Sequence, residues 1–370
     1  MAGSSFGNVF RITTWGESHG KAIGVVVDGC PAGLHLRERD IQIELNKRRP
    51  GQSPYCSPRD ESDKVEILSG VFEDKTTGTP ISLIVYNKDQ RSKDYSEMQN
   101  IYRPGHADHA FDLKYGFRDH RGGGRSSGRE TIGRVAGGAI AKKILASFGV
   151  EITTYTKAIG PFAVDMGNFD KEEIYNNPLR MPDSRVVPAT EEYLRGLIKD
   201  GNSSGGLIEC RVDGMPAGIG EPVFDKLDGT LARAVMSIGA VKGVEIGSGF
   251  EAAKRTGIEN NDFYRMGTGG GIQKVSNHAG GTTGGISDGS PLVLRAAVKP
   301  TPSIHKMQHA VDKESGDIDL MIGGRHDPII VPRAVIVVES MVALTILDLM
   351  LLNMGSRMEY LERVYGGPRA

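Results

Sequence analysis

The chain has 370 residues, of which 38% are hydrophobic and 25% are charged, and its formal net charge is -1. A nearly neutral chain has no global basic field of the kind that nucleic-acid-binding proteins use, so any anion site must come from local clusters of Arg and Lys. The three cysteines, Cys30, Cys56 and Cys210, show no CxxC spacing. This argues against a disulfide framework or a structural zinc site and favours a reducing cytoplasm. The N-terminal segment lacks a long apolar core behind a basic start, so we expect no signal peptide.

Short runs of β-branched residues bounded by glycine predict strands. In chain order they are residues 10–15, 22–28, 81–86, 207–212 and 292–298. Apolar residues at helical spacing predict helices between and after these strands. In chain order they begin near residue 37 and cover about 132–145, 227–235 and 342–351, the last being apolar almost all round and therefore central.

Three further segments have a distinct composition. The apolar run 335–352 is interrupted by Glu339 and Asp348, so we expect a buried strand at 335–338 followed by a core helix, rather than a membrane span. Residues 176–188 are polar and contain proline, which predicts an excursion at the surface. Residues 264–273 are so rich in glycine that they predict a mobile loop, not a dinucleotide fingerprint.

One segment occurs twice. Residues 27–34 (VDGCPAGL) recur as residues 212–219 (VDGMPAGI), 185 positions later, with six identities in eight. Each copy ends a predicted strand and precedes a predicted helix, which indicates two similar strand–turn–helix units related by a pseudo-twofold axis. The alternative is a common turn composition met twice by chance. Because no low-complexity linker divides the halves, we expect one intertwined domain.

His19 lies in the segment GESHG between two predicted strands. A histidine flanked by small residues in a loop has little cover of its own, so it can face a ligand and exchange a proton near neutral pH. The alternative is a turn histidine that is hydrogen-bonded to nearby backbone.

Three histidines, His106, His109 and His120, lie close together in the segment that begins RPGHADH. Two of them could share a helical face and bind a metal ion. However, Pro104 and Gly105 favour a loop at His106, and the nearby Arg and Lys side chains would repel a divalent cation. We therefore expect no metal.

The segment RGGGRSSGRE begins at Arg121 and leads into a predicted helix. Ser127 and Glu130 have the spacing of a capping box. The free N–H groups of the helix start, the serine hydroxyls and the side chains of Arg121, Arg125 and Arg129 together predict a phosphate site. The alternative is a capped helix with solvated arginines. The segment is not a Walker A loop, because it lacks the G-x-x-x-x-G-K-[ST] pattern.

Three other loops carry weaker signals. Lys47 opens the basic run KRRPG, where some cations serve the dipole of the preceding helix and the run as a whole favours a polyanionic ligand. KPTPS, residues 299–303, is a rigid loop after a strand. Asp327 lies near Arg325, which favours a salt bridge, although a carboxylate beside a cofactor could act as a base. Together the loops indicate an enzyme that acts on a phosphorylated, acidic small molecule, without naming the reaction.

Taken together, the loops resemble the chorismate synthase family. The matching segments follow the family's order over nearly the full chain. They are GESHG (16–20), RRPG (48–51), DQRSKDY (89–95), RPGHAD (103–108), RGGGRSSGRET (121–131), AVKGVEIG (240–247), SNHAGG (276–281), KPTPSI (299–304) and GRHDP (324–328).

The resemblance implies an α+β fold, a β–α–β sandwich with two four-stranded antiparallel sheets and helices, in one domain over residues 1–370. It implies a cytoplasmic homotetramer. The implied reaction is the anti-1,4-elimination of the 3-phosphate and a C6 hydrogen from 5-enolpyruvylshikimate 3-phosphate, which gives chorismate and phosphate. This is the last common step of the shikimate pathway to aromatic amino acids, and it requires reduced FMN without net redox change.

The resemblance also assigns residues. His19 matches the histidine that protonates the departing phosphate, His106 matches the one at the N1 side of the flavin, and Asp327 matches the carboxylate that works with flavin N5 on the C6 proton. The matching flavin-binding positions are Arg125, Ser126, Ser127, Gly239, Ala240, Gly284, Lys299, Pro300, Thr301, Pro302, Ser303 and Arg325. The matching substrate-binding positions are Ser18, Arg48, Arg103 and Arg129, with Arg325 serving both ligands.

The sequence departs from the family's usual pattern at several positions. Pro54 stands where many members have a second basic residue, for which Arg59 is a candidate substitute. Gly128 replaces an alanine and Gly239 replaces a common asparagine, so one side-chain contact to flavin is expected to be lost. Residues 264–273 are longer and richer in glycine than usual.

Three alternatives make different predictions. A phosphotransferase would depend on nucleotide and magnesium, and the missing Walker motif argues against it. An anion-binding or RNA-binding protein would interleave its basic patch with stacking aromatic residues, whereas the basic loops here contain Gly, Ser and Pro. A bifunctional enzyme would reduce its own flavin with NAD(P)H. Because no added domain is visible, we expect a separate flavin-reducing system.

Overall fold

Two antiparallel sheets form the outer layers of the computed structural model, which describes residues 3–56, 61–88, 98–323 and 327–367. The first sheet has the order β1 (Ser5–Phe6), β2 (Arg11–Gly16), β3 (Ala22–Asp28), β7 (Ile81–Tyr86) and β4 (Val65–Ile67). The second has the order β10 (Phe162–Ala163), β9 (Glu151–Ile159), β11 (Gly206–Asp213), β17 (Leu292–Val298) and β12 (Val241–Ile246). The expected segment 89–95, Arg59 and Arg325 lie outside the described residues.

The strand count differs from the expectation, while the mixed α+β class agrees with it. Each main sheet has five described strands instead of four. The extra strands are β1 and β10, which have two residues each and pair at the edge of longer strands. Runs this short show no alternation of apolar and polar residues, so the sequence pattern does not reveal them.

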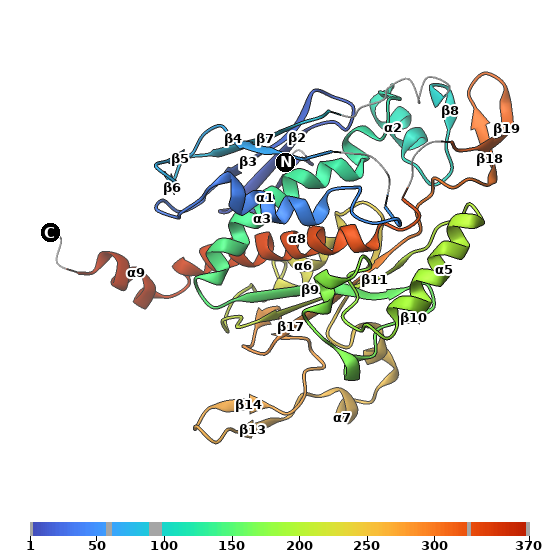
Figure 1. Cartoon of the computed structure of the whole chain (residues 1–370). Helices are drawn as coiled ribbons and strands as arrows, with labels where there is room; N and C mark the ends of the chain where they lie inside the picture. The colour runs from blue at the N-terminus through green and yellow to red at the C-terminus, as the bar shows by residue number, and fades with distance from the viewer. Residues whose placement is uncertain (1–2, 57–60, 89–97, 324–326, 368–370) are drawn as a thin grey trace.

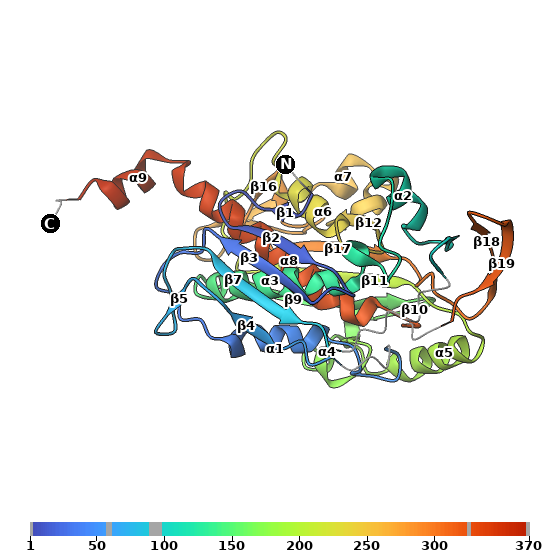
Figure 2. The ribbon, with the colours of Figure 1, turned by 90° about the horizontal axis from the view of Figure 1, so that it is seen from above.

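Helices fill the space between the two sheets, as Figure 1 shows. They are α1 (Glu38–Arg48), α3 (Thr131–Ala146), α6 (Leu227–Met236) and α8 (Val331–Leu352). Helices α1 and α3 pack under the first sheet, α6 and α8 pack on the second, and α3 and α8 contact each other at the centre. Figure 2 shows β3 and β7 lying over α3 from above. The side chains of β17 alternate in burial along the strand, so every second residue faces this helical layer.

The expected strand at 335–338 is wrong, because this segment belongs to α8. Its β-branched residues favour a strand locally, but the apolar pattern continues for the length of a long helix that is buried on all sides. Close contact with α3 depends on Gly138, where a Cβ atom would lie 2.3 Å from Cβ of Ser340. The most apolar window of the helix 331–355 has a mean hydropathy of 2.3, enough to cross a membrane, and 83% of that window is buried inside the protein. That burial is typical of a core helix.

The duplicated segment forms the same turn in both halves. The hydroxyl of Thr76 donates to the carbonyl oxygen of Pro31 at 2.6 Å, and the hydroxyl of Ser287 donates to that of Pro216 at 2.5 Å. The sequence match continues here, since TTGTPI at 76–81 corresponds to SDGSPL at 287–292. In both halves this segment leads into a strand that pairs antiparallel with the strand before the turn, β7 with β3 and β17 with β11. The pairing agrees with the predicted duplication, while the pseudo-twofold axis stays a prediction.

A small hairpin belongs to each copy of the duplicated unit. The hairpins are β5 (Val71–Phe72) with β6 (Lys75–Thr76), and β15 (Thr282–Thr283) with β16 (Ile286–Ser287). Glu73 and Asp74 have φ angles of 48° and 60°, and the equivalent Gly284 and Gly285 have φ angles of 65° and 89°. Gly284 therefore occupies a turn position that favours glycine for its backbone conformation alone.

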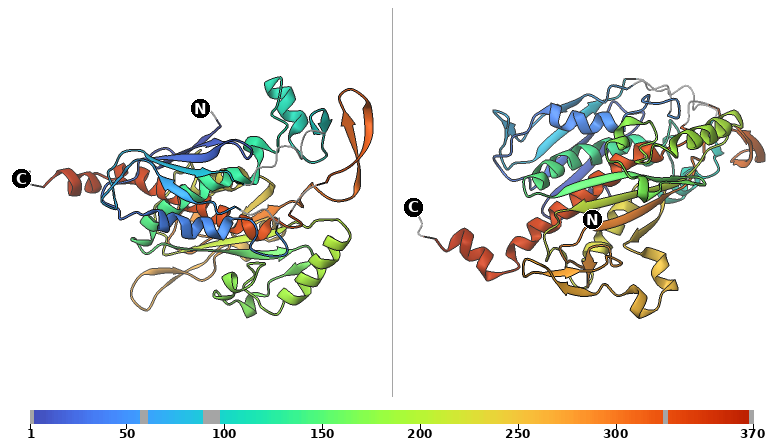
Figure 3. Two further views of the ribbon diagram at one scale, coloured as in Figure 1. Left: turned by 45° about the horizontal axis from the view of Figure 1, so that its top comes forward. Right: turned by 60° about the horizontal axis from the view of Figure 1, so that its bottom comes forward.

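Several elements belong neither to the two main sheets nor to the four central helices, and some of them, such as α9 and the β13–β14 and β18–β19 hairpins, project from the core in Figure 1 and in the views of Figure 3. They are α2 (Asp108–Tyr115), α4 (Glu173–Asn176), α5 (Val187–Lys199), α7 (Gly257–Asn260), α9 (Met358–Tyr365), β8 (Ile101–Tyr102), β13 (Tyr264–Met266), β14 (Ile272–Lys274), β18 (Met307–Asp312) and β19 (Gly316–Met321). The expected loop at 264–273 is thus part of the β13–β14 hairpin, whose mobility stays a prediction. The expected surface excursion at 176–188 is only partly correct, since Leu179 and Met181 are fully buried.

Candidate active site

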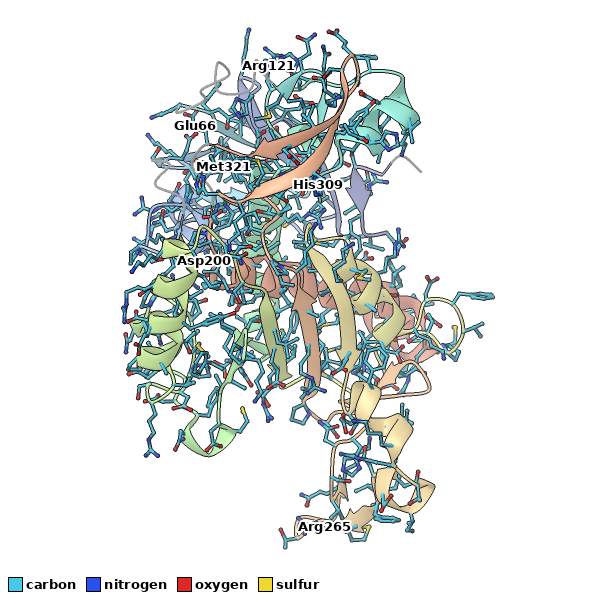
Figure 4. The ribbon with its side chains drawn as sticks, turned by 90° about the vertical axis from the view of Figure 1, so that its right-hand side faces the viewer. Glu66, Arg121, Asp200, Arg265, His309 and Met321 are labelled. Carbon is cyan, nitrogen blue, oxygen red and sulfur yellow. The ribbon has the colours of Figure 1, made fainter. Side chains whose placement is uncertain are left out.

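The loops singled out in the sequence gather mainly at one edge of the molecule, on the right in Figure 1, where α8 begins. The turn between β2 and β3, the C-terminal end of α1, the start of β11 and the end of β17 all reach this edge. Figure 4 looks onto it. The edge is therefore formed by both sheets and by the central helices.

His19 and Ser18 lie in the tight turn that joins β2 to β3. The side-chain amide of Asn87 donates to the carbonyl oxygens of Glu17 at 3.0 Å and Gly20 at 2.8 Å and holds this turn. Ser18 is 2% exposed, and its hydroxyl has no hydrogen-bond partner among the described residues. A buried hydroxyl without a partner is costly, so Ser18 is suited to a bound ligand.

The glycine-rich segment packs directly on His19. A Cβ atom at Gly122 would lie 2.5 Å from Cδ2 and 2.8 Å from Nε2 of the imidazole. No side chain larger than hydrogen fits there unless the histidine moves. The resemblance and the geometry therefore agree that these two loops form one surface.

The three arginines of this segment do not converge on one point. Arg121 is exposed and forms a bidentate pair with Asp119. Arg125 donates to the carbonyl oxygens of Gly16 and Thr14, both at 3.1 Å, and so ties the segment to β2. Different protein groups therefore engage each arginine, and the phosphate site expected from the three together stays a prediction.

The expected capping box is also not formed. The hydroxyl of Ser127 accepts from the backbone N–H of Arg129 at 3.3 Å, as a cap should. The carboxylate of Glu130 points away and accepts from Thr14 at 2.8 Å and from Arg134 at 2.8 Å. Tertiary partners thus take the side chain that the local pattern assigned to the helix start. The hydroxyl of Ser126, another expected flavin position, donates to Gly123 O at 2.7 Å.

Arg48 and Arg129 share the carboxylate of Asp63. Arg48 Nη2 lies 2.6 Å from Asp63 Oδ2, and Arg129 Nη1 lies 3.0 Å from Asp63 Oδ1. Arg48 is 1% exposed, and its burial lowers the pKa of the guanidinium to about 10. Burial alone would raise the pKa of Asp63, but the two arginines hold it below its ordinary value. Arg129 also donates from Nε to Asn87 at 3.0 Å, which connects this pair to the turn of His19.

Asp327 lies just before α8 and pairs with Arg333. The distance from Arg333 Nη1 to Asp327 Oδ2 is 2.7 Å. Arg333 also donates from Nε to the carbonyl oxygen of Arg48 at 3.1 Å. The salt bridge that the sequence favoured for Asp327 is thus formed, with a partner further along the chain than Arg325. Arg333 connects Asp327 to the arginines of the basic run.

His106 packs against the segment 299–303. Its Nδ1 lies 2.9 Å from the carbonyl oxygen of Pro104, and its Nε2 lies 3.0 Å from the hydroxyl of Ser303. A carbonyl oxygen only accepts, so Nδ1 carries a proton, whereas Nε2 can accept from the hydroxyl of Ser303 or, when it is protonated, donate to it. Lys299 donates from Nζ to Gly105 O at 2.9 Å and from its backbone N–H to Ala240 O at 2.9 Å.

Arg103 forms an ion pair with Asp108. Its Nε and Nη2 form a bidentate pair with the carboxylate at 2.8 and 2.9 Å, and both side chains are nearly buried. This pair holds Arg103 in the loop of His106 and does not use Nη1. The expected contact of Arg103 to substrate stays a prediction.

Sequence reasoning missed the residues that connect these groups. Ser204 donates its backbone N–H to Pro328 O at 3.1 Å, and the hydroxyl of Ser203 donates to Thr301 O at 2.7 Å. The segment before β11 thus joins the Asp327 loop to the segment 299–303. Asp63 was also missed. It lies just before β4 and between the basic motifs at 48–51 and 121–131, and an acidic residue in such a place is a signal for an internal counter-ion.

The flavin positions expected from the resemblance fall into two groups. Lys299 to Ser303, with Gly239 and Ala240 beside them, lie next to His106. The hydroxyl of Thr301 is buried without a hydrogen-bond partner among the described residues, so this segment has spare capacity for a polar ligand. Gly284 precedes β17, whereas Lys299 follows it, so within one chain the length of that strand separates them. Arg325 is outside the described residues.

Comparisons with known proteins identify the family. The family model described as chorismate synthase matches residues 10–351. Chorismate synthases of Agathobacter rectalis and Lachnoclostridium phytofermentans are 63% and 61% identical over 365 residues, covering 99% of this chain and 99% and 100% of theirs. A crystal structure of chorismate synthase superimposes with a TM-score of 0.76 at 33% identity and covers 98% of this chain and 97% of that one. The chain belongs to the chorismate synthase family.

Proposed function

We propose that the chain converts 5-enolpyruvylshikimate 3-phosphate to chorismate and phosphate by 1,4-elimination, with reduced FMN as cofactor. Family membership over the whole length supports the reaction. The single structural observation that supports this location is the chain of contacts from the His19 turn through Arg129, Asp63, Arg48 and Arg333 to Asp327. It brings a proton donor, two buried guanidiniums and a carboxylate to one edge.

In this proposal His19 protonates the departing phosphate. Phosphate leaves more easily when it is protonated, and a histidine beside it supplies that general acid. Gly122 allows the backbone of the glycine-rich segment to approach the imidazole. Ser18, which is buried and lacks a partner among the described residues, would donate its hydroxyl to a substrate oxygen. The two side chains would then act on the same end of the substrate.

Arg48 and Arg129 hold the substrate's anionic groups. Both are almost fully buried, so their charge is weakly screened and acts strongly on a bound anion. Asp63 fixes their positions and compensates part of their charge in the absence of substrate. Such preorganised cations bind the phosphate and stabilise the charge that develops as it leaves.

His106 and Asp327 serve the flavin side of the site in this proposal. Reduced FMN, when bound, supplies electron density to the substrate as the phosphate leaves, and the protein positions it. Lys299, Thr301 and Ser303 offer it polar contacts, and the hydroxyl of Thr301, which has no partner in the described part of the chain, fits such a ligand. His106 would carry a proton at Nε2 to balance anionic charge, and Asp327 would accept the C6 proton.

The wider assignments are part of the same proposal. We propose a single domain over residues 1–370 that acts in the cytoplasm as a homotetramer and receives reduced flavin from a separate system. Assembly from several copies would allow Gly284, which lies far from Lys299 in one chain, to contribute to a neighbouring site. The extensive shared core of both halves supports the single domain.

Substitution of the two histidines tests the division of roles. We expect His19→Ala and His106→Ala to lose turnover by about 10²–10⁴-fold, the range for acid–base groups, while flavin binding persists. Turnover is measured anaerobically and flavin binding by fluorescence. Asp327→Asn keeps an acceptor for Arg333 and should lose turnover with the fold intact. Full activity in any variant would remove that residue from the mechanism.

A further inference from the structure

A separate polar pocket adjoins the Asp327–Arg333 pair, on the side of α4. Its volume is about 350 Å³. Three cationic side chains line it, Lys47, Arg180 and Arg333, and none of its described lining residues is acidic. Neither His19 nor His106 is among the lining residues. The pocket therefore lies beside the proposed catalytic groups without containing their proton-transfer histidines.

The cations around this pocket are not fully compensated. Lys47 pairs with Glu44 at 2.9 Å, and Arg333 pairs with Asp327. Arg180 has no carboxylate partner among the described residues. Its guanidinium donates to the side-chain carbonyl of Gln52 at 3.3 Å, and burial lowers its pKa from the ordinary value. An arginine stays charged after such a shift, so the described residues leave this positive charge without a carboxylate counter-ion.

The backbone and an aromatic ring hold Arg180 in place. Its φ angle is 59°, which is rare for a residue other than glycine, and the neighbouring Leu179 and Met181 are fully buried. Its guanidinium lies 4.7 Å from the ring centroid of Tyr175, and the ammonium of Lys47 lies 4.9 Å from the same ring. Figure 2 shows α4, which carries this tyrosine, beside α1. Strained residues that are fixed from both sides are typical of binding sites.

We propose that this pocket is a second anion site, which binds a phosphate group outside the catalytic cluster. A phosphate dianion supplies the missing negative charge and accepts hydrogen bonds from both guanidinium and ammonium groups. The pocket has room for free phosphate or for a small phosphate monoester. The assignment depends on the charges and geometry of this pocket and not on the elimination reaction.

Cys56 provides a local probe, because it lines the same pocket. The other two cysteines, Cys30 and Cys210, are buried and therefore react slowly, whereas Cys56 is partly exposed. Burial raises the pKa of all three thiols, so the difference in reactivity comes from access. The experiment measures the rate of Cys56 alkylation by iodoacetamide in the full chain, with mass spectrometry of the modified peptide. We expect inorganic phosphate to slow this rate in a saturable manner, compared with chloride at equal ionic strength.

Two variants and a control separate this site from the catalytic groups. Arg180→Gln and Lys47→Gln should each raise the phosphate concentration for half-protection by about tenfold or more, since each removes a charge-assisted hydrogen bond. Arg265→Gln is the control, because Arg265 lies on the projecting hairpin in Figure 4. It should leave the phosphate concentration for half-protection unchanged. Glycerol 3-phosphate is the second probe, and whichever probe protects at lower concentration identifies the preferred form.

Two results would overturn the anion site. One is unchanged alkylation of Cys56 at saturating concentrations of both probes. The other is equal protection in wild type, Arg180→Gln and Lys47→Gln, which would place the bound anion elsewhere. Protection without chorismate formation by the wild type would support the pocket while removing the proposed reaction, so the two claims fail separately.

Discussion

Asp63→Asn removes the carboxylate charge that Arg48 and Arg129 both contact, while it preserves the shape of the side chain. The φ angle of Asp63 is 44°, and asparagine tolerates this left-handed region better than most residues. The substitution therefore isolates the lost charge from any change in backbone strain. The asparagine side chain retains one carbonyl oxygen as an acceptor, and Glu61 still lies 3.7 Å from Arg129 Nη1. Arg48 is therefore the guanidinium that loses its charged partner.

The expected cost follows from the burial of these side chains. Asp63 is 1% exposed, and its two contacts are 2.6 and 3.0 Å long. Breaking a buried ion pair by removal of one partner costs about 3–5 kcal/mol, because a buried charge is left uncompensated. We expect a loss near the lower end, about 3 kcal/mol, since one hydrogen bond remains. Loss of orientation of two substrate-binding arginines should also lower kcat/KM by about tenfold or more.

Denaturant unfolding and steady-state kinetics measure the two effects. Asp213→Asn is the matched control, because Asp213 forms a bidentate pair with Arg211 on the exposed surface. Exposed pairs contribute at most about 1 kcal/mol. If Asp63→Asn were no less stable than Asp213→Asn and retained wild-type kcat/KM, the proposed coupling of the two buried arginines through Asp63 would be refuted.

Two further predictions concern His19 and Asp262. Gly122→Ala should lower kcat by about tenfold or more, because its Cβ would displace His19. Gly128→Ala is the control and should keep the wild-type kcat, because nothing lies within 4 Å of its Cβ. Steady-state kinetics measure both, and equal kcat values in the two variants would contradict the contact between Gly122 and His19. Burial alone would raise the pKa of Asp262, but hydrogen bonds from Ser276 and two backbone N–H groups lower it to about 2. The ionised carboxylate therefore stabilises the folded state above pH 3.8, and this contribution is lost as the pH falls towards 2. Asp262→Asn should flatten the acid side of the stability curve measured by thermal unfolding, and an unchanged acid slope would argue against this linkage.

Much of the layered fold follows from local patterns. The runs of β-branched residues in β3, β7 and β17 and the one-sided stripe of α6 predicted those elements with bounds that the structure confirms or nearly confirms. Local patterns failed where burial was complete. The start of α8 contains enough β-branched residues to suggest a strand, and packing against α3 and the second sheet favours the helix.

The candidate site was predictable as a set of loops but not as a set of contacts. Motifs indicated His19, Arg48, Arg129 and His106, and the structure connects the first three through shared partners. Which carboxylate compensates which arginine depends on distant segments that meet only in the fold. Asp108 binding Arg103 is local in sequence, yet the motif alone suggested a ligand contact.

The departures at Gly128 and Gly239 have little structural consequence for packing. A Cβ atom at either position would have nothing within 4 Å among the described residues, so the alanine common in the family fits at position 128, and the Cβ of the common asparagine fits at position 239. Neither glycine is therefore required by close approach of another group. The lost side chain at Gly239 bears on ligand contact, beside Ala240 and Lys299, rather than on the fold.

Chorismate formation under anaerobic conditions tests the central claim most directly. The purified chain is mixed with 5-enolpyruvylshikimate 3-phosphate and FMN that has been fully reduced, and chorismate and phosphate are quantified together. The proposal predicts equal amounts of both products with reduced FMN, repeated over many turnovers, and none with oxidised FMN. Absence of chorismate with reduced flavin, in a folded protein that binds the flavin, would contradict it.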